Sequence, residues 1–189
     1  MRRGLWMLLA LAAGLGGWLL AGCYENPADA TESEDPGPGL FDVTWYNEAW
    51  GYQLSGWCVD DQGRLFRFDH GDERWSGDAD TIPEAALREK YAHGRQLVGQ
   101  VTPVELAAMT ALVPVAAAGQ VSPPISTGCA DFGTIGYQAY TYLPQRHAYV
   151  RVMLHQRGDV ARLNDAPAAA ALHAWLVALT DTDDATCEP

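Results

Sequence analysis

Hydrophobic residues divide the chain into an apolar start, a polar stretch and a long patterned region. The start is apolar from Leu5 to Leu20, is interrupted only by glycines, and follows two arginines. Residues 24–39 hold five acidic residues and three prolines, a composition that cannot build a hydrophobic core. From Leu40 onward, apolar residues recur with the periods of strands and helices, so we expect the folded domain to begin near this residue.

Alternating apolar and polar residues predict several strands in this region. The turn-forming residues Asp60–Gly63 predict a hairpin between two of them, and a second hairpin is expected across residues 144–147. Two shorter strands are expected at 95–101 and 160–163. The longer predicted strands are 41–46, 52–59, 64–68, 134–143 and 148–156.

Three segments carry helix signals. In both 81–94 and 102–119, a threonine is followed three positions later by a glutamate, the pattern of a capping box, and a glycine marks the end. The second of these segments has an apolar run of only 13 residues, from Leu106 to Ala118, which is too short to span a bilayer. A third helix is expected after Asp165, with a core-facing stripe formed by Leu172, Trp175, Leu176 and Leu179.

These elements predict an α+β fold. In this fold, an antiparallel sheet built from two β-hairpins carries about three helices packed mainly on one face. A chain of 189 residues suits one domain, which we place at residues 40–189 with an acidic tail at its end.

The charge balance narrows the possible partners. The chain holds 12 basic and 24 acidic residues, a formal net charge of −12 at pH 7. A field of this sign repels phosphate-rich ligands, so we expect no nucleic-acid partner.

The end of the apolar start has a specific pattern. A basic beginning followed by an apolar run is typical of an export signal. Here the run ends in Leu20-Ala21-Gly22-Cys23, which resembles the lipobox of bacterial lipoproteins at all four positions. Ordinary secretion and a retained membrane-spanning anchor are the two alternatives.

The resemblance implies that residues 1–22 are removed and that Cys23 carries the lipid, including fatty acyl chains such as palmitate, that anchors the protein to a membrane. Loss of two arginines would lower the formal net charge from −12 to −14. Tyr24 follows in place of the aspartate that would resemble an inner-membrane retention signal, so the outer membrane is favoured if the organism has one. Residues 23–39 would then be a tether about 40–50 Å long, at about 3 Å per residue.

Three cysteines remain after lipidation of Cys23. An exported protein meets oxidising conditions, so one disulfide is expected. Cys58 lies on a predicted strand, where a thiol behaves as a small apolar group, whereas Cys129 lies in a loop and Cys187 in the tail. We therefore expect a Cys129–Cys187 bridge, with Cys58–Cys129 as the alternative.

Aromatic residues are dense near the start of the domain, and two interpretations are open. Large rings can supply the core of a small domain, or exposed rings can stack on sugars and grip a protein partner. Alternation along the strands places some rings on each face of the sheet. We expect Trp45 and Trp57 to be the exposed binding rings among Phe41, Trp45, Tyr46, Trp50, Tyr52 and Trp57.

The sequence gives weaker support for a metal, cofactor or catalytic site. The acidic stretch 69–84 could bind calcium, but its spacing does not match an EF-hand, and the alternative is a solvated loop that precedes a helix. No cofactor motif, metal-ligand spacing or nucleophile elbow is present, so the sequence assigns no catalytic, metal or cofactor residue.

The functional expectation is a lipid-anchored protein of the cell envelope with a non-catalytic binding, inhibitory or assembly role. Its partners would be the membrane, through the lipid, and an envelope protein or glycan. The alternative is a small envelope hydrolase with dispersed catalytic residues. Such an enzyme needs a pocket that joins a histidine, a carboxylate and either a serine or Cys58.

Overall fold

The structure, a computed structural model, describes residues 39–71, 74–75, 77 and 79–182. The predicted signal segment, Cys23 and Cys187 lie outside these residues, as does all of the predicted tether except Gly39.

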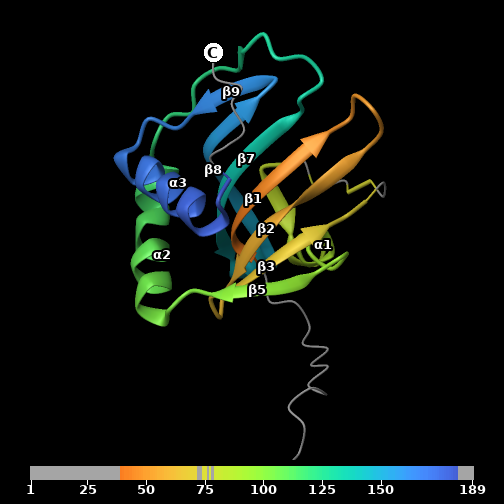
Figure 1. The fold of residues 1–189 in the computed structure, drawn as a ribbon. Coiled ribbons are helices and arrows are strands. Elements are labelled where there is room, and N and C mark those ends of the chain that lie inside the picture. Colours follow the sequence, from red (N-terminus) through yellow and green to blue (C-terminus); the bar gives the residue numbers. More distant parts are fainter. Residues whose placement is uncertain (1–38, 72–73, 76, 78, 183–189) are drawn as a thin grey trace, which may run out of the picture. The chain divides into compact units, whose positions relative to one another are not determined.

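The described residues form nine strands, which pair into an antiparallel sheet in the order β5-β3-β2-β1-β7-β8-β9-β6, with β4 pairing with β8 (Figure 1). The two predicted hairpins are β2–β3 and β7–β8, and β1 joins them by pairing with both β2 and β7. The strands are β1 (Gly39–Asn47), β2 (Gln53–Asp60), β3 (Arg64–Asp69), β4 (Thr81–Pro83), β5 (Gln96–Gln100), β6 (Ile125–Ser126), β7 (Thr134–Leu143), β8 (Ala148–Gly158) and β9 (Val160–Leu163).

Two tight turns close the hairpins. Gly63 ends the β2–β3 turn with φ +77°, a conformation that glycine adopts without strain. A short 3₁₀ helix, Pro144–Arg146, joins β7 to β8 and ends at His147, which is left-handed with φ +45°. The sequence predicted a hairpin at each of these positions.

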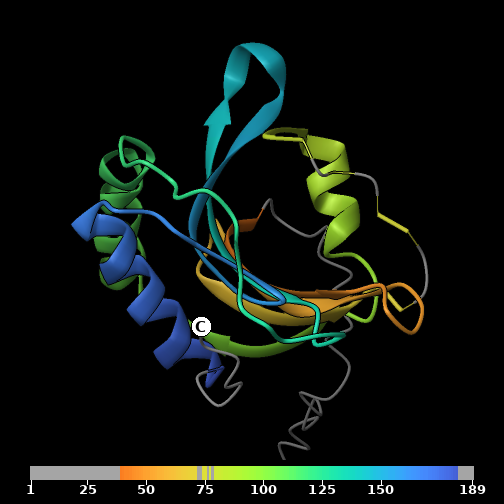
Figure 2. The ribbon, with the colours of Figure 1, turned by 90° about the horizontal axis from the view of Figure 1, so that it is seen from above.

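The helices lie on both faces of the sheet (Figure 2). Helices α2 (Pro103–Ala117) and α3 (Pro167–Thr180) pack together on one face, and α1 (Glu84–Lys90) lies on the other. The predicted α+β fold is confirmed. The expected placement on one face holds for α2 and α3, while α1 adds a second layer.

Each face has its own hydrophobic core, and β1 contributes to both because its side chains alternate. Phe41 and Val43 join α2 and α3 in the first core, together with Leu172 and Leu176 of the predicted stripe. Asp42 and Thr44 point toward the second face, where α1 contributes Leu87 to the other core.

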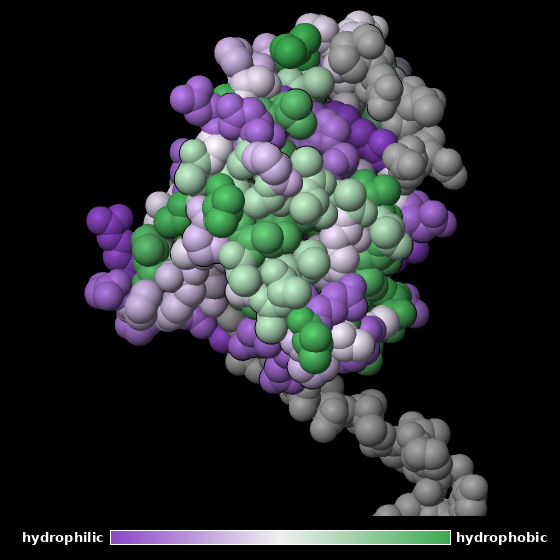
Figure 3. Space-filling view, turned by 90° about the vertical axis from the view of Figure 1, so that its left-hand side faces the viewer, coloured by the Kyte–Doolittle hydropathy of each residue, from purple (hydrophilic) through white to green (hydrophobic). Residues whose placement is uncertain are grey.

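The outward side of α2 and α3 is apolar. Val104 is 82% exposed and Val115 is 56% exposed. Figure 3, which views the side of the domain where α2 and α3 lie, shows hydrophobic side chains gathered there. In the part of the chain that the structure describes, no helix has both the length and the apolar character needed to cross a bilayer.

The two predicted capping boxes have different outcomes. Thr102 caps α2, because its side chain accepts a hydrogen bond from the backbone N–H of Glu105 at 3.3 Å. The prediction for Thr81 is wrong: Thr81 belongs to β4 and pairs with Val150 of β8, and α1 begins only at Glu84 without a side-chain cap. The helix also ends at Lys90, before the predicted stop at Gly94.

Candidate functional site

Trp45 and Trp57 lie on the same face of neighbouring strands. In the register of β1 and β2, Trp45 is opposite Ser55 and Val43 is opposite Trp57. Residues directly opposite each other share a face, so the two indoles are diagonal neighbours on the face that also carries α3. The expectation that both rings are exposed is corrected: Trp45 and Trp57 are half-buried, because they share a sheet face with α3 and pack at the margin of the first core.

The two rings line one cleft, which we call the Trp cleft. Its volume is about 640 Å³, within the range of small-molecule sites. Apolar walls are supplied by Phe132 and Ile135, and the other lining residues are Val43, Asn47, Ser55, Asp131, Asp181 and Thr182.

Hydrogen bonds hold the loop that forms one wall of the Trp cleft. The indole N–H of Trp45 donates to the carbonyl of Phe132 at 3.2 Å, and the Asn47 amide donates to the carbonyl of Asp131 at 3.0 Å. The Asp159 carboxylate accepts the backbone N–H groups of Phe132 and Gly133, each at 3.0 Å. A site anchored in this way is largely formed before a ligand arrives.

The charges at the Trp cleft are acidic. Asp131 and Asp181 are exposed at its rim. Among the described residues that line it, none is a lysine or arginine, although the Arg67 guanidinium lies 5.9 Å from the Trp57 ring centroid. Carboxylate, amide and hydroxyl oxygens accept hydrogen bonds from hydroxyl or ammonium donors. The Trp cleft is therefore suited to a neutral or cationic ligand.

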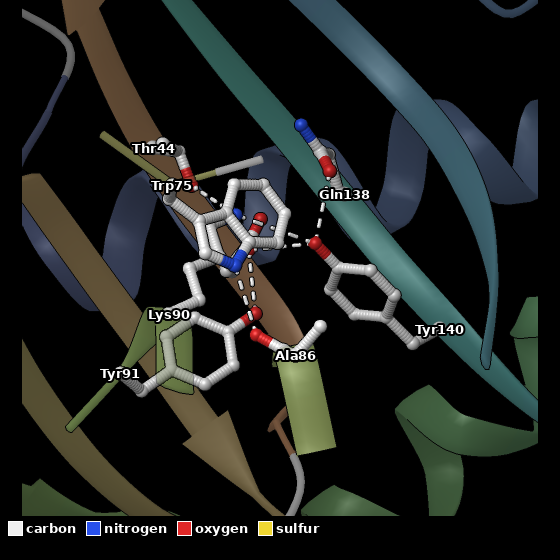
Figure 4. Close-up of polar contacts among 8 residues, drawn as sticks. Thr44, Trp75, Ala86, Lys90, Tyr91, Gln138 and Tyr140 are labelled. Atoms are coloured by element: carbon white, nitrogen blue, oxygen red, sulfur yellow. Dashed lines mark hydrogen bonds and ion pairs between the residues drawn. The ribbon is translucent and has the colours of Figure 1, made fainter. Parts of the chain in front are cut away.

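A second polar centre, which the sequence did not predict, lies on the opposite face of the sheet (Figure 4). The Lys90 ammonium donates to Asp42 Oδ2 at 2.6 Å and to the Thr44 hydroxyl at 3.0 Å. The hydroxyls of Tyr91 and Tyr140 donate to the same carboxylate oxygen at 2.7 and 2.8 Å. We call these five residues the Lys90 network.

Trp75 lies over the Lys90 network. Its ring centroid is 4.9 Å from Lys90 Nζ, and its indole N–H donates to the carbonyl of Ala86 at 2.8 Å. Its backbone N–H donates to the Tyr52 hydroxyl at 3.0 Å. These contacts place an aromatic face on the buried ammonium, a favourable cation–π arrangement.

The chemistry of the Lys90 network is that of a buried ion pair. Burial is the main cause that raises the pKa of Tyr91 and Tyr140 well above 10, and the nearby Asp42 carboxylate raises them further. Both phenols therefore stay protonated and act as hydrogen-bond donors. The Lys90 ammonium is hydrogen-bonded to Asp42 and Thr44. A sequence signal existed: Lys90 is the only lysine in the chain, and Asp42 is the only charged residue of the predicted strand 41–46.

Cys58 is a free, buried cysteine, which excludes the alternative Cys58–Cys129 bridge. Burial raises the pKa of its thiol to about 12, so it stays protonated and is a poor nucleophile at neutral pH. Because Cys187 lies outside the described residues, the Cys129–Cys187 bridge stays a prediction.

The remaining candidates do not assemble into a reactive site. His155 Nδ1 and His173 Nε2 are 2.9 Å apart, and the rings of His70 and His93 are 4.5 Å apart. Asp72, Glu73 and Asp78 of the acidic stretch lie outside the described residues. Elsewhere in the described chain, no three His, Cys, Asp or Glu side chains are grouped so as to hold a metal ion.

Comparisons with protein-family models, with curated proteins and with solved structures found no match to this chain.

Proposed function

We propose that this protein is a lipid-anchored component of the cell envelope whose folded domain binds a glycan in the Trp cleft without modifying it. The resemblance of Leu20–Cys23 to a lipobox supports the anchor. The acyl chains must supply the membrane affinity, since a strongly acidic domain gains nothing from anionic lipid headgroups.

One observation carries the binding proposal: Trp45 and Trp57 are diagonal neighbours on a sheet face and line a cleft whose rim holds hydrogen-bond acceptors. Aromatic faces offer large, rigid contact area to the apolar side of a sugar ring. Asp131 and Asp181 at the rim can accept hydrogen bonds from sugar hydroxyls. The combination of ring platforms and acceptors fits a saccharide better than a purely apolar ligand.

The charges restrict the class of glycan. A phosphorylated or uronic polymer would meet two carboxylates and a strongly acidic domain, and this repulsion disfavours it. A neutral glycan, or one with free amino groups, meets no such penalty.

The alternative, a hydrolase, requires a histidine together with a carboxylate and a nucleophile. Ser55 and two carboxylates line the Trp cleft, but among its described lining residues there is no histidine. This composition favours the binding role over the hydrolase.

The test is calorimetric titration of the mature chain, with Cys23 replaced by Ala to keep it in solution, against neutral, amino-containing and phosphorylated oligosaccharides. We expect binding to members of the first two groups. Trp57→Ala should weaken it by about 2 kcal/mol or more, as for a hot-spot aromatic residue. Tyr142→Ala, which removes an exposed ring that does not line the Trp cleft, is the matched control. Equal affinity in the Trp57→Ala variant, with unchanged melting temperature, would refute the site.

A further inference from the structure

A second hollow adjoins the Trp cleft at the edge of β2. We call it the edge hollow; its volume is about 450 Å³. It shares Trp45 and Ser55 with the Trp cleft, so the two are contiguous across these residues. Its other lining residues are Trp50, Gly51, Tyr52, Gln53, Leu54, Asp69 and Gly71.

The edge hollow exists because β3 is shorter than β2. The last residue of β3, Asp69, pairs with Ser55, whereas β2 begins two residues earlier at Gln53. Regular pairing with β2 ends at Asp69, and the next residue stays beside β2 through a hydrogen bond from the His70 N–H to the carbonyl of Leu54 at 2.8 Å. The β1–β2 connection therefore projects past its neighbour on this side and leaves room beside it.

Trp50 stands at the tip of this projection. It is 81% exposed, whereas Trp45 and Trp57 are half-buried. The neighbouring Gly51 has φ +114°, and a Cβ built there would meet no atom within 4 Å, so the tip is open to solvent. An indole this exposed contributes little to the fold, and its large apolar face is available for contact.

The chemistry of the two hollows is alike. The edge hollow adds Asp69 to the carboxylates of the Trp cleft, and its described lining residues include neither lysine nor arginine. Aromatic rings and hydrogen-bond acceptors thus continue from Trp57, across Trp45 and Ser55, to Trp50.

We propose that the ligand is a linear glycan strand several sugars long, which runs from the Trp cleft into the edge hollow and ends against Trp50. The inference rests on the proposed function and adds the length of the ligand to it. Successive sugars of a strand present repeated apolar faces, which suits a row of separated rings. A single sugar would occupy one hollow and leave the other empty.

The experiment compares ligand lengths. The mature chain with Cys23→Ala is titrated with cello-oligosaccharides and with chito-oligosaccharides of one to six units. In the parent protein we expect affinity to rise from two to six units. The Trp50→Ala variant should lose this gain. Its affinity for the six-unit ligand should be about tenfold lower than that of the parent, as expected for the loss of a single exposed aromatic contact, while its affinity for the two-unit ligand is unchanged. Trp50→Phe, which keeps a ring, should retain most of the gain.

The outcomes separate the two proposals. If two-unit and six-unit ligands bind equally, or if Trp50→Ala binds six units as the parent does, the extended strand is wrong while glycan binding stands. If no oligosaccharide of any length binds, or if only a basic peptide such as tetralysine does, the proposed function itself fails and the inference fails with it.

Discussion

Lys90 and Asp42 are 48 positions apart in the sequence, yet Lys90 Nζ lies 2.6 Å from Asp42 Oδ2, and neither side chain is more than 2% exposed. The pair connects the last residue of α1 to the central strand β1. Burying two charges is costly, and the cost is partly offset here: the hydroxyls of Tyr91 and Tyr140 donate to Asp42 Oδ2, and the Thr44 hydroxyl accepts from Lys90, although Asp42 Oδ1 is buried without a hydrogen-bond partner among the described residues.

Replacing Lys90 with Met should therefore destabilise the domain strongly. The substitution leaves a buried carboxylate without its cation, which costs about 3–5 kcal/mol. Chemical denaturation measures this free energy of unfolding. The control is Arg74→Met, which removes an exposed partner of Glu48 and should cost less than about 1 kcal/mol. Similar losses in the two variants would contradict the role of the Lys90 network.

Alkaline pH should weaken the fold through Tyr91 and Tyr140. Because their pKa values in the folded domain lie well above 10, the unfolded chain loses these protons first. The free energy of unfolding is then unaffected by these phenols below pH 10 and falls above it, by about 1.4 kcal/mol per pH unit for each phenol. Denaturation curves from pH 8 to 11.5 measure the slope.

Tyr140→Phe is the control for this slope. The variant removes one phenol but keeps Cys58, whose thiol pKa of about 12 adds its own pH dependence above pH 9. The slope above pH 10 should fall by about 1.4 kcal/mol per pH unit in the variant. An unchanged slope would show that Tyr140 titrates normally.

Cys58 should resist modification in the folded protein. Its thiol is buried and stays protonated at pH 8, so a thiol reagent should label it only when the domain unfolds. Mass spectrometry after iodoacetamide treatment, with and without denaturant, follows the reaction. Rapid labelling without denaturant would contradict the buried position.

Loss of the lipid should release the protein from the membrane. We expect Cys23→Ala to move the protein from the detergent phase to the aqueous phase, since two or more acyl chains anchor stably and the domain is acidic. Detergent phase partitioning of cell fractions measures this change. A variant that still partitions with membranes would show that the lipid is not the anchor.

The predicted bridge is tested by peptide mapping without reduction. We expect one linked peptide that contains both Cys129 and Cys187, which would stabilise the domain by about 3–4 kcal/mol in the loop-entropy model. Alkylation of both thiols in the native protein would contradict this prediction.

Local patterns in the sequence were sufficient for much of the fold. Period-two alternation and turn-forming residues predicted both hairpins, since a half-buried strand and a tight turn impose their residue types within a few positions. The same alternation predicted aromatic rings on each face of the sheet, and the structure has Trp57 against the first core and Tyr52 against the second.

Other features depended on contacts between distant segments. Thr81 and Thr102 begin the same capping pattern, but only Thr102 caps a helix, because the backbone of Thr81 pairs with β8 in the sheet. A local pattern contains no information about that competing strand. The sequence placed Trp45 and Trp57 in strands, but the Trp cleft around them also needs the loop at 131–132 and residues 181–182, which follow α3.

The Lys90 network also depends both on local sequence patterns and on contacts between distant segments. Local sequence signals were enough to place Lys90 on a helix and Asp42 on a strand: a helix was predicted at 81–94 and an alternating strand at 41–46. Their contact depends on how α1 packs against the sheet, which no local pattern contains. The cost of burying the Lys90 charge is offset only when Asp42 of β1 and the hydroxyl of Tyr140 on β7 are brought to it by the fold.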